Sequence, residues 1–304
     1  MTHLLNCLVT ALDLLALASL SGLLTLRLVI APLGITHTAE VTWGRTLLPA
    51  LTLLTLSTLL ILLLRSLAMS PADSVDVSRL LPMVLLHSHF GQVWLIRLLA
   101  LGLLWGAWWL GRGGELTRTA ALAMLLPLAL LIYSRAAIGH AADQGDLTTQ
   151  EWADMFHLLG AVIWSGSILI FARPHDRDET DTVPGFAGMA RRISRLAGVL
   201  MPLVLLTGLY NAYHRLTGLQ ALISSTYGGI LLLKVGLVAV MIAIAAINRY
   251  RILPLLHAIS AQSSNTDKGM LQGRFLLFLR LEAVAALAVL LLAAVLLHSA
   301  PPIQ

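Results

Sequence analysis

The sequence predicts an all-α, polytopic membrane protein whose roughly eight transmembrane helices form one bundle. Of its 304 residues, 58% are hydrophobic and only 12% are charged, and the mean hydropathy is +0.86. A water-soluble protein of this composition would expose large apolar patches, so the lipid bilayer must be its solvent. No stretch is long and polar enough for a soluble domain. We therefore expect residues 1–304 to form a single integral-membrane domain.

Eight apolar stretches reach the roughly 20 residues that a helix needs to cross a bilayer. These stretches are Leu8–Ile30, Thr46–Leu64, Val93–Leu110, Thr119–Gly139, Trp152–Ala172, Leu196–His214, Tyr227–Ile247 and Phe275–His298. An even number of spans places both termini on one side. Of the 20 Lys and Arg residues, 14 fall on the opposite side and five on the terminal side. The positive-inside rule then predicts periplasmic termini in a bacterium, with the loops Arg173–Arg195 and Arg251–Arg274 in the cytoplasm.

Composition also limits the classes of function. The single cysteine, Cys7, excludes an internal disulfide and any Cys-rich zinc or iron–sulfur site. The basic residues are spread through interhelical loops, so no nucleic acid is expected as a partner. The motif G-x-x-x-x-G-K-[ST] is absent, which argues against ATP-driven pumping. We expect no enzymatic activity, and no cleavable signal, since the first dozen residues carry no Lys or Arg.

The histidines are distributed unevenly in this topology. Seven of the ten are predicted at or near the terminal side: His3, His87, His89, His140, His157, His214 and His298. The thioethers of Met83 and Met155 fall in the same layer, and mixed nitrogen and sulfur ligands are typical of copper sites. Ordinary interhelical hydrogen bonding is the alternative role for these imidazoles.

His140 and His157 are the strongest candidates for a shared metal site. They close the fourth span and open the fifth across the short loop Ala141–Glu151, which makes their helices neighbours. The sequence therefore predicts one copper site near the outer boundary that contains both. The ligands that would complete it are Met155, His87, His89 or His214.

Charged residues inside the spans are costly and are usually functional or paired. Arg97 and Arg135 are predicted near enough to the outer boundary for their guanidinium groups to reach water. Lys234 lies about two turns into its span and needs a carboxylate, for which Asp13 and Asp154 are the candidates.

Two carboxylates have further predicted roles. Asp154 lies three residues before His157 on one helix face, so its alternative role is to orient that imidazole. Glu282 lies near Arg280, and we expect a structural salt bridge between them.

Several passages together resemble the copper resistance protein D family (CopD), which comprises bacterial inner-membrane proteins. They are Gly139-His140-Ala141-Ala142, His157-Leu158-Leu159-Gly160, Trp164-Ser165-Gly166, Thr207-Gly208-Leu209-Tyr210-Asn211, Tyr227-Gly228, Leu233-Lys234, Asn248-Arg249, and Phe90-Gly91 followed by Trp94 and Arg97. One departure is Ser167, where the family usually has a second glycine.

The resemblance implies copper transport or delivery at the bacterial inner membrane, in copper homeostasis and resistance. The ion, Cu(I) or Cu(II), would be imported from a separate periplasmic copper-binding protein of the CopC type. We expect this partner to contact the loops Ala68–His89, Ala141–Glu151 and Arg215–Thr226. The rival interpretations are a haem-binding cytochrome b-like electron carrier and a non-transporting membrane scaffold.

Overall fold

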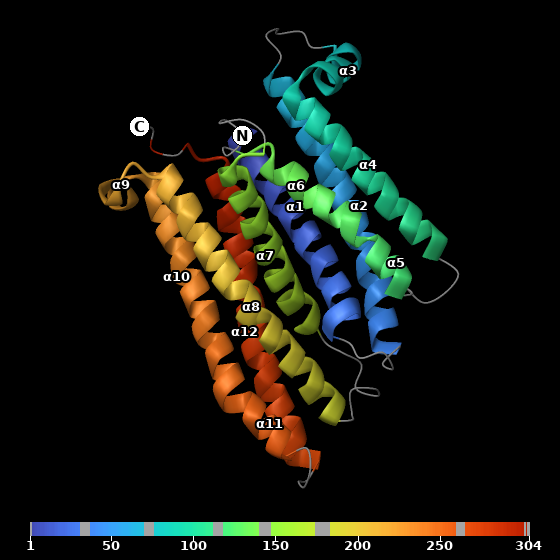
Figure 1. The fold of residues 1–304 in the computed structure, drawn as a ribbon, viewed down its shortest axis with the longest axis vertical. Coiled ribbons are helices and arrows are strands. Elements are labelled where there is room, and N and C mark those ends of the chain that lie inside the picture. The colour runs from blue at the N-terminus through green and yellow to red at the C-terminus, as the bar shows by residue number, and fades with distance from the viewer. Residues whose placement is uncertain are drawn as a thin grey trace.

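The computed structural model of the chain describes residues 2–30, 37–69, 76–111, 118–139, 147–173, 183–259, 265–300 and 302. These residues form helices and no strand. Eight of the helices are long and apolar enough to cross a membrane, which confirms the predicted fold class. Figure 1 shows them side by side in one bundle.

The spans occur in the predicted order. They are α1 (Thr2–Thr25) with the π-helical turn η1 (Leu26–Ile30), α2 (His37–Ala68), α4 (His89–Leu110), α5 (Arg118–Ala123) with α6 (Leu125–Ala136), α7 (Thr149–Phe171), α8 (Val183–Arg215), α10 (Thr226–Ile247) and α12 (Asn265–Leu297). A second π-helical turn, η4 (Asn248–Ile252), and the short helix α11 (Leu253–Ile259) extend α10.

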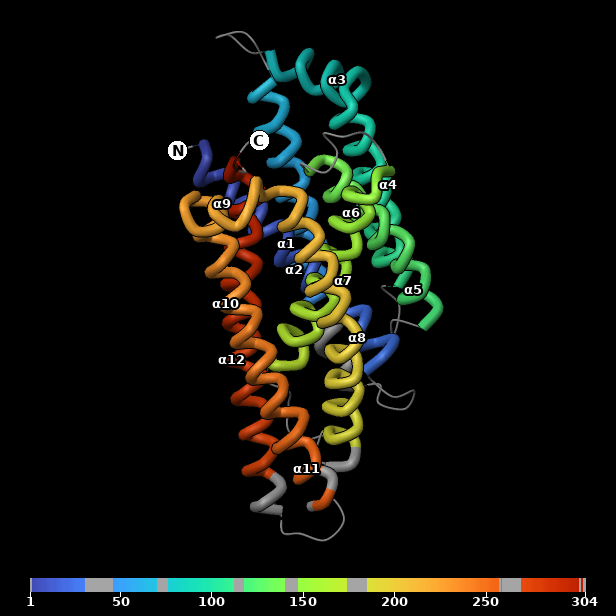
Figure 2. The backbone as a smooth tube through the Cα atoms, turned by 60° about the vertical axis from the view of Figure 1, so that its left-hand side comes forward, coloured from blue at the N-terminus to red at the C-terminus, as the bar shows by residue number. Residues whose placement is uncertain are grey.

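Both termini lie at the same end of the bundle, as Figures 1 and 2 show. At this end, the ring atom Nε2 of His3 lies 3.1 Å from the backbone oxygen of His298. The arrangement agrees with the even number of spans expected from the sequence. We call this end the terminal end and the other the opposite end.

Helix α1 lies at the centre of the bundle. It packs against α2, α7 and α12, and most of its residues from Cys7 onward are buried. Such burial requires a helix that is apolar on every side, and the sequence of α1 meets this need almost throughout. Helix α10, in contrast, buries only Tyr227, Gly228 and Met241 and lies at the outside in Figure 2.

The backbones of α1 and α7 approach each other unusually closely. A Cβ atom on Gly22 would clash with the carbonyl oxygen of Gly166, and one on Gly166 would clash with the carbonyl oxygen of Ala18. Membrane helices gain little from apolar burial against each other, so close packing of small residues supplies much of their attraction. These small residues therefore fix the central pair of helices.

Two short helices, α3 (Val77–His87) and α9 (Leu219–Ser224), form corners at the terminal end. In each corner a serine hydroxyl accepts the backbone N–H of a glycine three residues later: Ser88 from Gly91 at 2.9 Å, and Ser225 from Gly228 at 3.0 Å. Serine is a favoured cap for a helix start. Each glycine also lies against a carbonyl oxygen of its short helix, with no room for a side chain.

The order of elements occurs twice along the chain. Helices α1, α2, α3 and α4 are followed by α7, α8, α9 and α10, with a short helix third in each series. Ser88 and Ser225 begin the fourth helix of each series. Arg97 and Lys234 follow these serines at the same spacing. The two halves therefore share one plan, and their first helices, α1 and α7, meet at the centre.

Candidate functional site

The most deeply buried charges form an ion-pair network among α1, α4 and α6. Arg97 Nη2 lies 2.5 Å from Asp13 Oδ1, and neither side chain is exposed. Arg135 Nε lies 3.9 Å from Asp13 Oδ2. The prediction that Arg97 and Arg135 reach water is therefore wrong. Both guanidinium groups turn inward because the central helix presents a carboxylate to them.

Hydroxyl and carbonyl groups complete this network. Arg97 donates to Thr58 Oγ1 at 3.0 Å, to Ser134 Oγ at 3.2 Å and to the Leu131 carbonyl at 3.2 Å. Ser57 donates to Asp13 Oδ1 at 3.0 Å. These bonds use the donors of the guanidinium, as a charge buried this deeply requires. The network thus fixes α1, α2, α4 and α6 to one another.

The network continues to the surface of the terminal end. Arg135 donates to Thr10 Oγ1 at 3.1 Å, and Thr10 Oγ1 lies 2.9 Å from His298 Nε2. Burial and the positive charge of Arg135 lower the pKa of His298 to about 4. This imidazole is therefore neutral at physiological pH. Nearby, Cys7 Sγ lies 3.8 Å from His3 Nδ1.

A second charged cluster lies among α7, α8 and α10. Arg215, on α8, forms an ion pair with Asp154 on α7. Lys234, on α10, is attracted by Asp154 and repelled by Arg215. Of the two carboxylates considered for Lys234, Asp154 is therefore the one that acts on it, because Asp13 is held by Arg97 and Arg135. Among the described residues, this cluster sets one carboxylate against two cations.

His157 lies in the same region, and its ring is oriented by α8. Its Nδ1 lies 3.0 Å from the Val204 carbonyl oxygen and 3.2 Å from Thr207 Oγ1. The Thr207 hydroxyl itself donates to the Leu203 carbonyl at 2.6 Å, so the Nδ1 proton belongs to the bond with Val204. In the neutral ring this tautomer leaves the lone pair on Nε2.

The close approach of His157 to α8 depends on Gly208. A Cβ atom at Gly208 would lie 2.9 Å from the Cε1 atom of His157. The expected role of Asp154 in orienting this imidazole is not the arrangement seen. A carbonyl of the facing helix holds the ring nitrogen, and Asp154 is turned toward Arg215.

The other predicted ligands lie apart from His157. His87 and His89 are exposed at the corner between α3 and α4, and α3 packs against α2 and α4. His214 is exposed, with its ring 4.4 Å from that of Tyr210. Met155, partly buried, packs against the apolar core.

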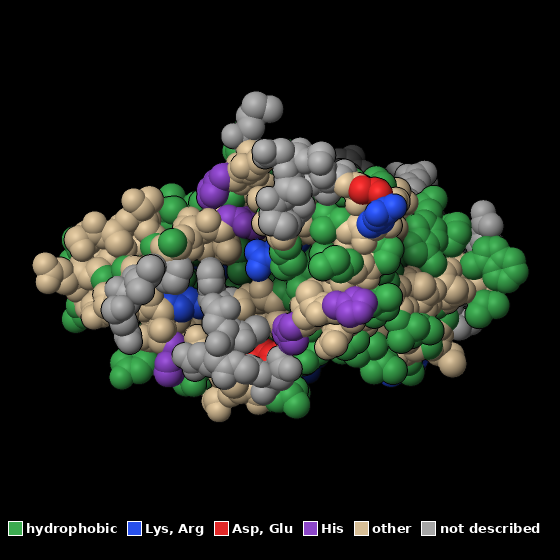
Figure 3. All heavy atoms as spheres, turned by 90° about the horizontal axis from the view of Figure 1, so that it is seen from above, with side chains coloured by type: hydrophobic (Ala, Val, Ile, Leu, Met, Phe, Trp, Pro, Cys, Tyr) green, Lys and Arg blue, Asp and Glu red, His purple; other side chains and the backbone are tan. Residues whose placement is uncertain are grey.

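Figure 3 looks down on the terminal end and shows histidine side chains at several separate places. His140 lies outside the described residues. Within the described part of the chain, no three His, Cys, Asp or Glu side chains are arranged to hold a metal ion. Of the two histidines predicted to share a copper site, His157 is the one that the structure describes, and the Val204 carbonyl orients its ring.

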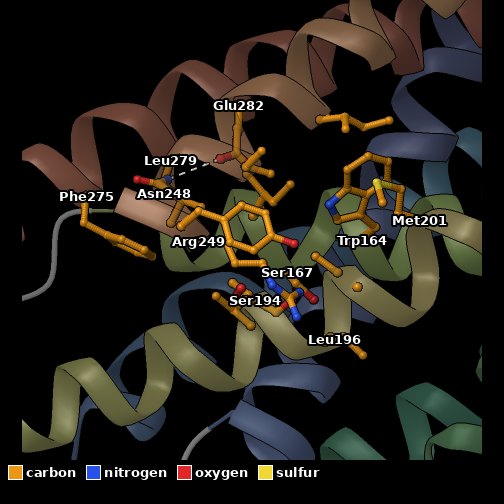
Figure 4. A pocket seen from close by; sticks show the side chains of 18 residues that line it. Trp164, Ser167, Ser194, Leu196, Met201, Asn248, Arg249, Phe275, Leu279 and Glu282 are labelled. Atoms are coloured by element: carbon orange, nitrogen blue, oxygen red, sulfur yellow. Dashed lines mark hydrogen bonds between the residues drawn. The ribbon is translucent and has the colours of Figure 1, made fainter. Parts of the chain in front are cut away.

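A cavity of about 130 Å³ lies further along the bundle, among α7, α8, α10, η4 and α12. Figure 4 shows Trp164 and Met201 near each other, and Asn248 hydrogen-bonded to Glu282. The expected salt bridge between Glu282 and Arg280 is not present. Glu282 instead accepts a bond from Asn248 Nδ2 at 3.3 Å, and Arg280 donates to the Ala172 carbonyl.

Sequence reasoning missed the network around Asp13 and this cavity. The signal for the network was present: Asp13, Arg97 and Arg135 are all charges within predicted spans at similar distances from the terminal side. A cavity leaves no such signal, because its wall is assembled from residues of separate helices.

Two sequence profiles match the chain in consecutive regions. Residues 1–149 match "Copper resistance protein D-like, N-terminal domain", and residues 187–296 match "Copper resistance protein D". The first region ends at the first residue of α7, and the second begins within α8, so α7 lies between the two matches.

Two curated proteins are similar to parts of the chain. Copper resistance protein D of Pseudomonas syringae pv. tomato is 28% identical over 187 residues, which is 57% of this chain and 57% of that protein. Copper transport protein CutJ of Bacillus subtilis (strain 168) is 30% identical over 120 residues, 39% of this chain and 22% of that protein. No solved structure matches. The two profiles, the relatives and the eight apolar helices together show that the chain is a multi-pass membrane protein of the copper resistance protein D family.

Proposed function

We propose that this chain transports copper across the bacterial inner membrane and imports it from a separate periplasmic donor of the CopC type. The names of both relatives refer to copper. The terminal end would be the periplasmic face, because 14 of the 20 basic residues fall on the opposite side. A soluble periplasmic donor reaches only that face. The segments 68–89, 141–151 and 215–226 would meet it.

The state of His157 is the observation that carries the proposal. Metal-binding histidines commonly donate one ring N–H to a carbonyl or carboxylate, which fixes the tautomer and directs the other nitrogen to the ion. The bond from Nδ1 to the Val204 carbonyl does this for His157. Copper accepts imidazole nitrogen readily in either oxidation state. Nε2 of His157 is thus the atom that we assign to the cargo ion.

His140 is the proposed partner of His157 in this site. The two residues flank the connection between α6 and α7, which pack against each other. Met155, His87, His89 and His214 remain the candidates for a completing ligand. The described positions of His87 and His89, exposed at the α3–α4 corner, suit initial capture from the donor.

The charges around His157 favour brief binding of a copper ion during transport over its storage. A copper ion at His157 would be repelled by Lys234 and Arg215, and of the carboxylates in the described part of the chain Asp154 alone lies against them. Weak binding allows an ion to leave a site again, as transport requires. A tight metallochaperone or storage site would lack this repulsion.

The test measures copper in cells and in the purified protein. Cells that produce the chain should accumulate more copper than cells without it, and His140→Ala with His157→Ala should abolish the difference while membrane insertion is intact. Gly236→Ala, at a helix position with open space around it, is the matched control. Wild-type copper affinity in the double variant would contradict the site. A haem absorption band without copper would favour the cytochrome interpretation. Absence of both haem and copper would favour the scaffold interpretation.

A further inference from the structure

The cavity near the opposite end contains a carboxylate for which the copper site has no use. Glu282, on α12, is only 3% exposed. Its hydrogen bond from Asn248 Nδ2 is 3.3 Å long, beyond the usual range for this type of bond. Among the residues that the structure describes, no Lys, Arg or His forms an ion pair with it.

A carboxylate in this position is unstable by itself. The middle of a membrane protein solvates a negative charge poorly, so a buried carboxyl group there is neutralised by a cation or by a proton. Ionisable groups within spans commonly mark ion paths or proton relays. Glu282 therefore needs a neutralising partner that the described side chains do not supply.

The groups that face Glu282 across the cavity are limited. Of the described residues in the cavity wall, Arg249 and Tyr250 are the only other titratable ones, and both are on η4; α7, α8 and α10 contribute none. Arg249 Nη1 donates to the Ser194 carbonyl at 2.9 Å, and its guanidinium lies 5.8 Å from the centre of the Tyr250 ring. Arg249 is thus engaged by α8 and by its neighbour, and its charge is directed away from Glu282.

The cavity also offers sites for water. Trp164 Nε1 and Asn248 Oδ1 are buried and have no hydrogen-bond partner among the described residues, and both residues line the wall. Figure 4 shows the indole nitrogen of Trp164 turned toward the cavity. Unsatisfied buried polar groups of this kind are commonly satisfied by water. A cavity of about 130 Å³ has room for several water molecules.

The rim of the cavity lies in the last turns of the candidate span Thr226–Leu256, toward the opposite end. Arg249 and Tyr250 are exposed, and η4 lies beyond α10 near the opposite end, at α11 in Figure 2. Water that enters here would pass these residues and reach the bond between Asn248 and Glu282. Glu282 would therefore exchange with the aqueous phase of the opposite end.

We propose that Glu282 is a proton-exchange site, reached by water from the opposite end, that couples cation movement to proton movement. The carboxylate accepts a proton from hydronium in the cavity and leaves water; the neutral carboxyl returns that proton to water in the reverse step. When the carboxyl is deprotonated, its negative charge favours a cation in the membrane interior. The coupling rests on the proposed transport of copper, whereas the proton exchange does not.

The first experiment tests proton exchange without copper. Dicyclohexylcarbodiimide adds to protonated carboxyl groups in apolar surroundings and leaves a stable N-acylurea that peptide mass spectrometry locates. In purified full-length protein, Glu282 should be modified at acidic pH, and the modification should be lost as the pH rises. Glu282→Gln should remove this modification, and Glu151→Gln, outside the cavity, should not. Absence of modification at Glu282 throughout the pH series would overturn the proposal.

The second experiment tests coupling in proteoliposomes loaded with a copper chelator. An imposed pH gradient should change the rate of copper uptake by the wild type and by Gly236→Ala, which lies outside the cavity wall. Glu282→Gln should retain uptake down a copper gradient and lose the response to pH. An unchanged pH response in Glu282→Gln would refute coupling through this residue. Absence of copper uptake by the wild type would instead refute the transport function and the coupling, and the labelling result would still decide the proton site.

Discussion

Asp13 is a single carboxylate that serves two buried cations. Arg97 and Asp13 are completely buried, and Arg135 lies close to the same carboxylate. Removing one partner of a buried pair leaves an uncompensated charge, a change that typically costs about 3 to 5 kcal/mol. Asp13→Asn keeps the shape and removes the charge. We expect it to lower the thermal unfolding temperature of the purified protein substantially.

Arg79→Ala is the matched control for this substitution. Its ion pair with Asp76 is largely exposed, with 89% and 57% of the two side chains accessible, and exposed pairs contribute little to stability. The unfolding temperature of Arg79→Ala should equal that of the wild type. Equal unfolding temperatures for Asp13→Asn and the wild type would show that the network does not stabilise the fold.

Lys234 gives a second prediction at the scale of a single residue. Under the proposed function its charge weakens copper binding at His157, because like charges in an interior of effective dielectric about 20 repel by roughly 1 to 4 kcal/mol at short range. Lys234→Met should therefore raise copper affinity, on the order of tenfold, and slow copper release. Lys234→Arg keeps the charge and should bind like the wild type. Competition with a chromophoric copper chelator measures both, and weaker binding by Lys234→Met would contradict the charge argument.

Residue pairing was the least predictable level of this structure. The sequence predicted a carboxylate for Lys234 and a salt bridge between Glu282 and Arg280. Asp154 attracts Lys234, whereas Glu282 and Arg280 bond to other groups. A position along a span gives the depth of a charge, whereas the direction of the side chain depends on which helices surround it. Arg97 and Arg135 turn inward because α1, which carries Asp13, lies at the centre of the bundle. That central position depends on how all the helices pack.

The close contact of α1 with α7 is the clearest test at the scale of the element. Gly166→Ala would place a methyl group against the Ala18 carbonyl, and overpacking of this kind typically costs about 1 to 3 kcal/mol. We expect a lower unfolding temperature and a poorer yield of monodisperse protein. Gly236→Ala has open space around it and should be neutral or slightly stabilising, since alanine favours the helix by about 0.5 to 1 kcal/mol.

A tolerated Gly166→Ala would indicate that the two helices can separate without loss of stability. The sequence offered part of this result in advance, because Trp164-Ser165-Gly166 was among the passages that resemble the family. Several of the passages that resemble the family have a structural role in the packing of the helices. Phe90-Gly91 and Tyr227-Gly228 form the two corners, and Gly208 admits the ring of His157.

At the scale of the whole molecule, the number of spans and the common end of the termini were accessible from sequence. Apolar length determines the number of spans, and an even number fixes the relation of the termini. Their arrangement around α1 was not accessible, since most of the spans are apolar on every side. Periodicity cannot show which face of such a helix meets protein and which meets lipid.

The orientation of the bundle gives a prediction that reporter fusions can check. Alkaline phosphatase fused after Gln304 should be active, because this enzyme works only in the periplasm. A green fluorescent protein fused at the same position and exported by the same route should not fluoresce. Fusions within residues 173–195 should give the reverse pattern. Fluorescent C-terminal fusions with inactive phosphatase would invert the orientation and move the proposed donor contacts to the other face.

The burial of α1 also constrains how the protein is made. Its Asp13 enters the membrane with the first span, but its partner Arg97 lies 84 residues later, and α7 follows later still. During synthesis, α1 therefore lies in lipid or beside the insertion machinery before the partners of Asp13 are made. Its unpaired carboxyl group has the lower free energy there when it is protonated. The helix that becomes the centre of the finished bundle is the one that remains incomplete longest. Ribosome-bound chains that end before α4 should accordingly cross-link α1 to the insertion machinery, and longer chains should release it.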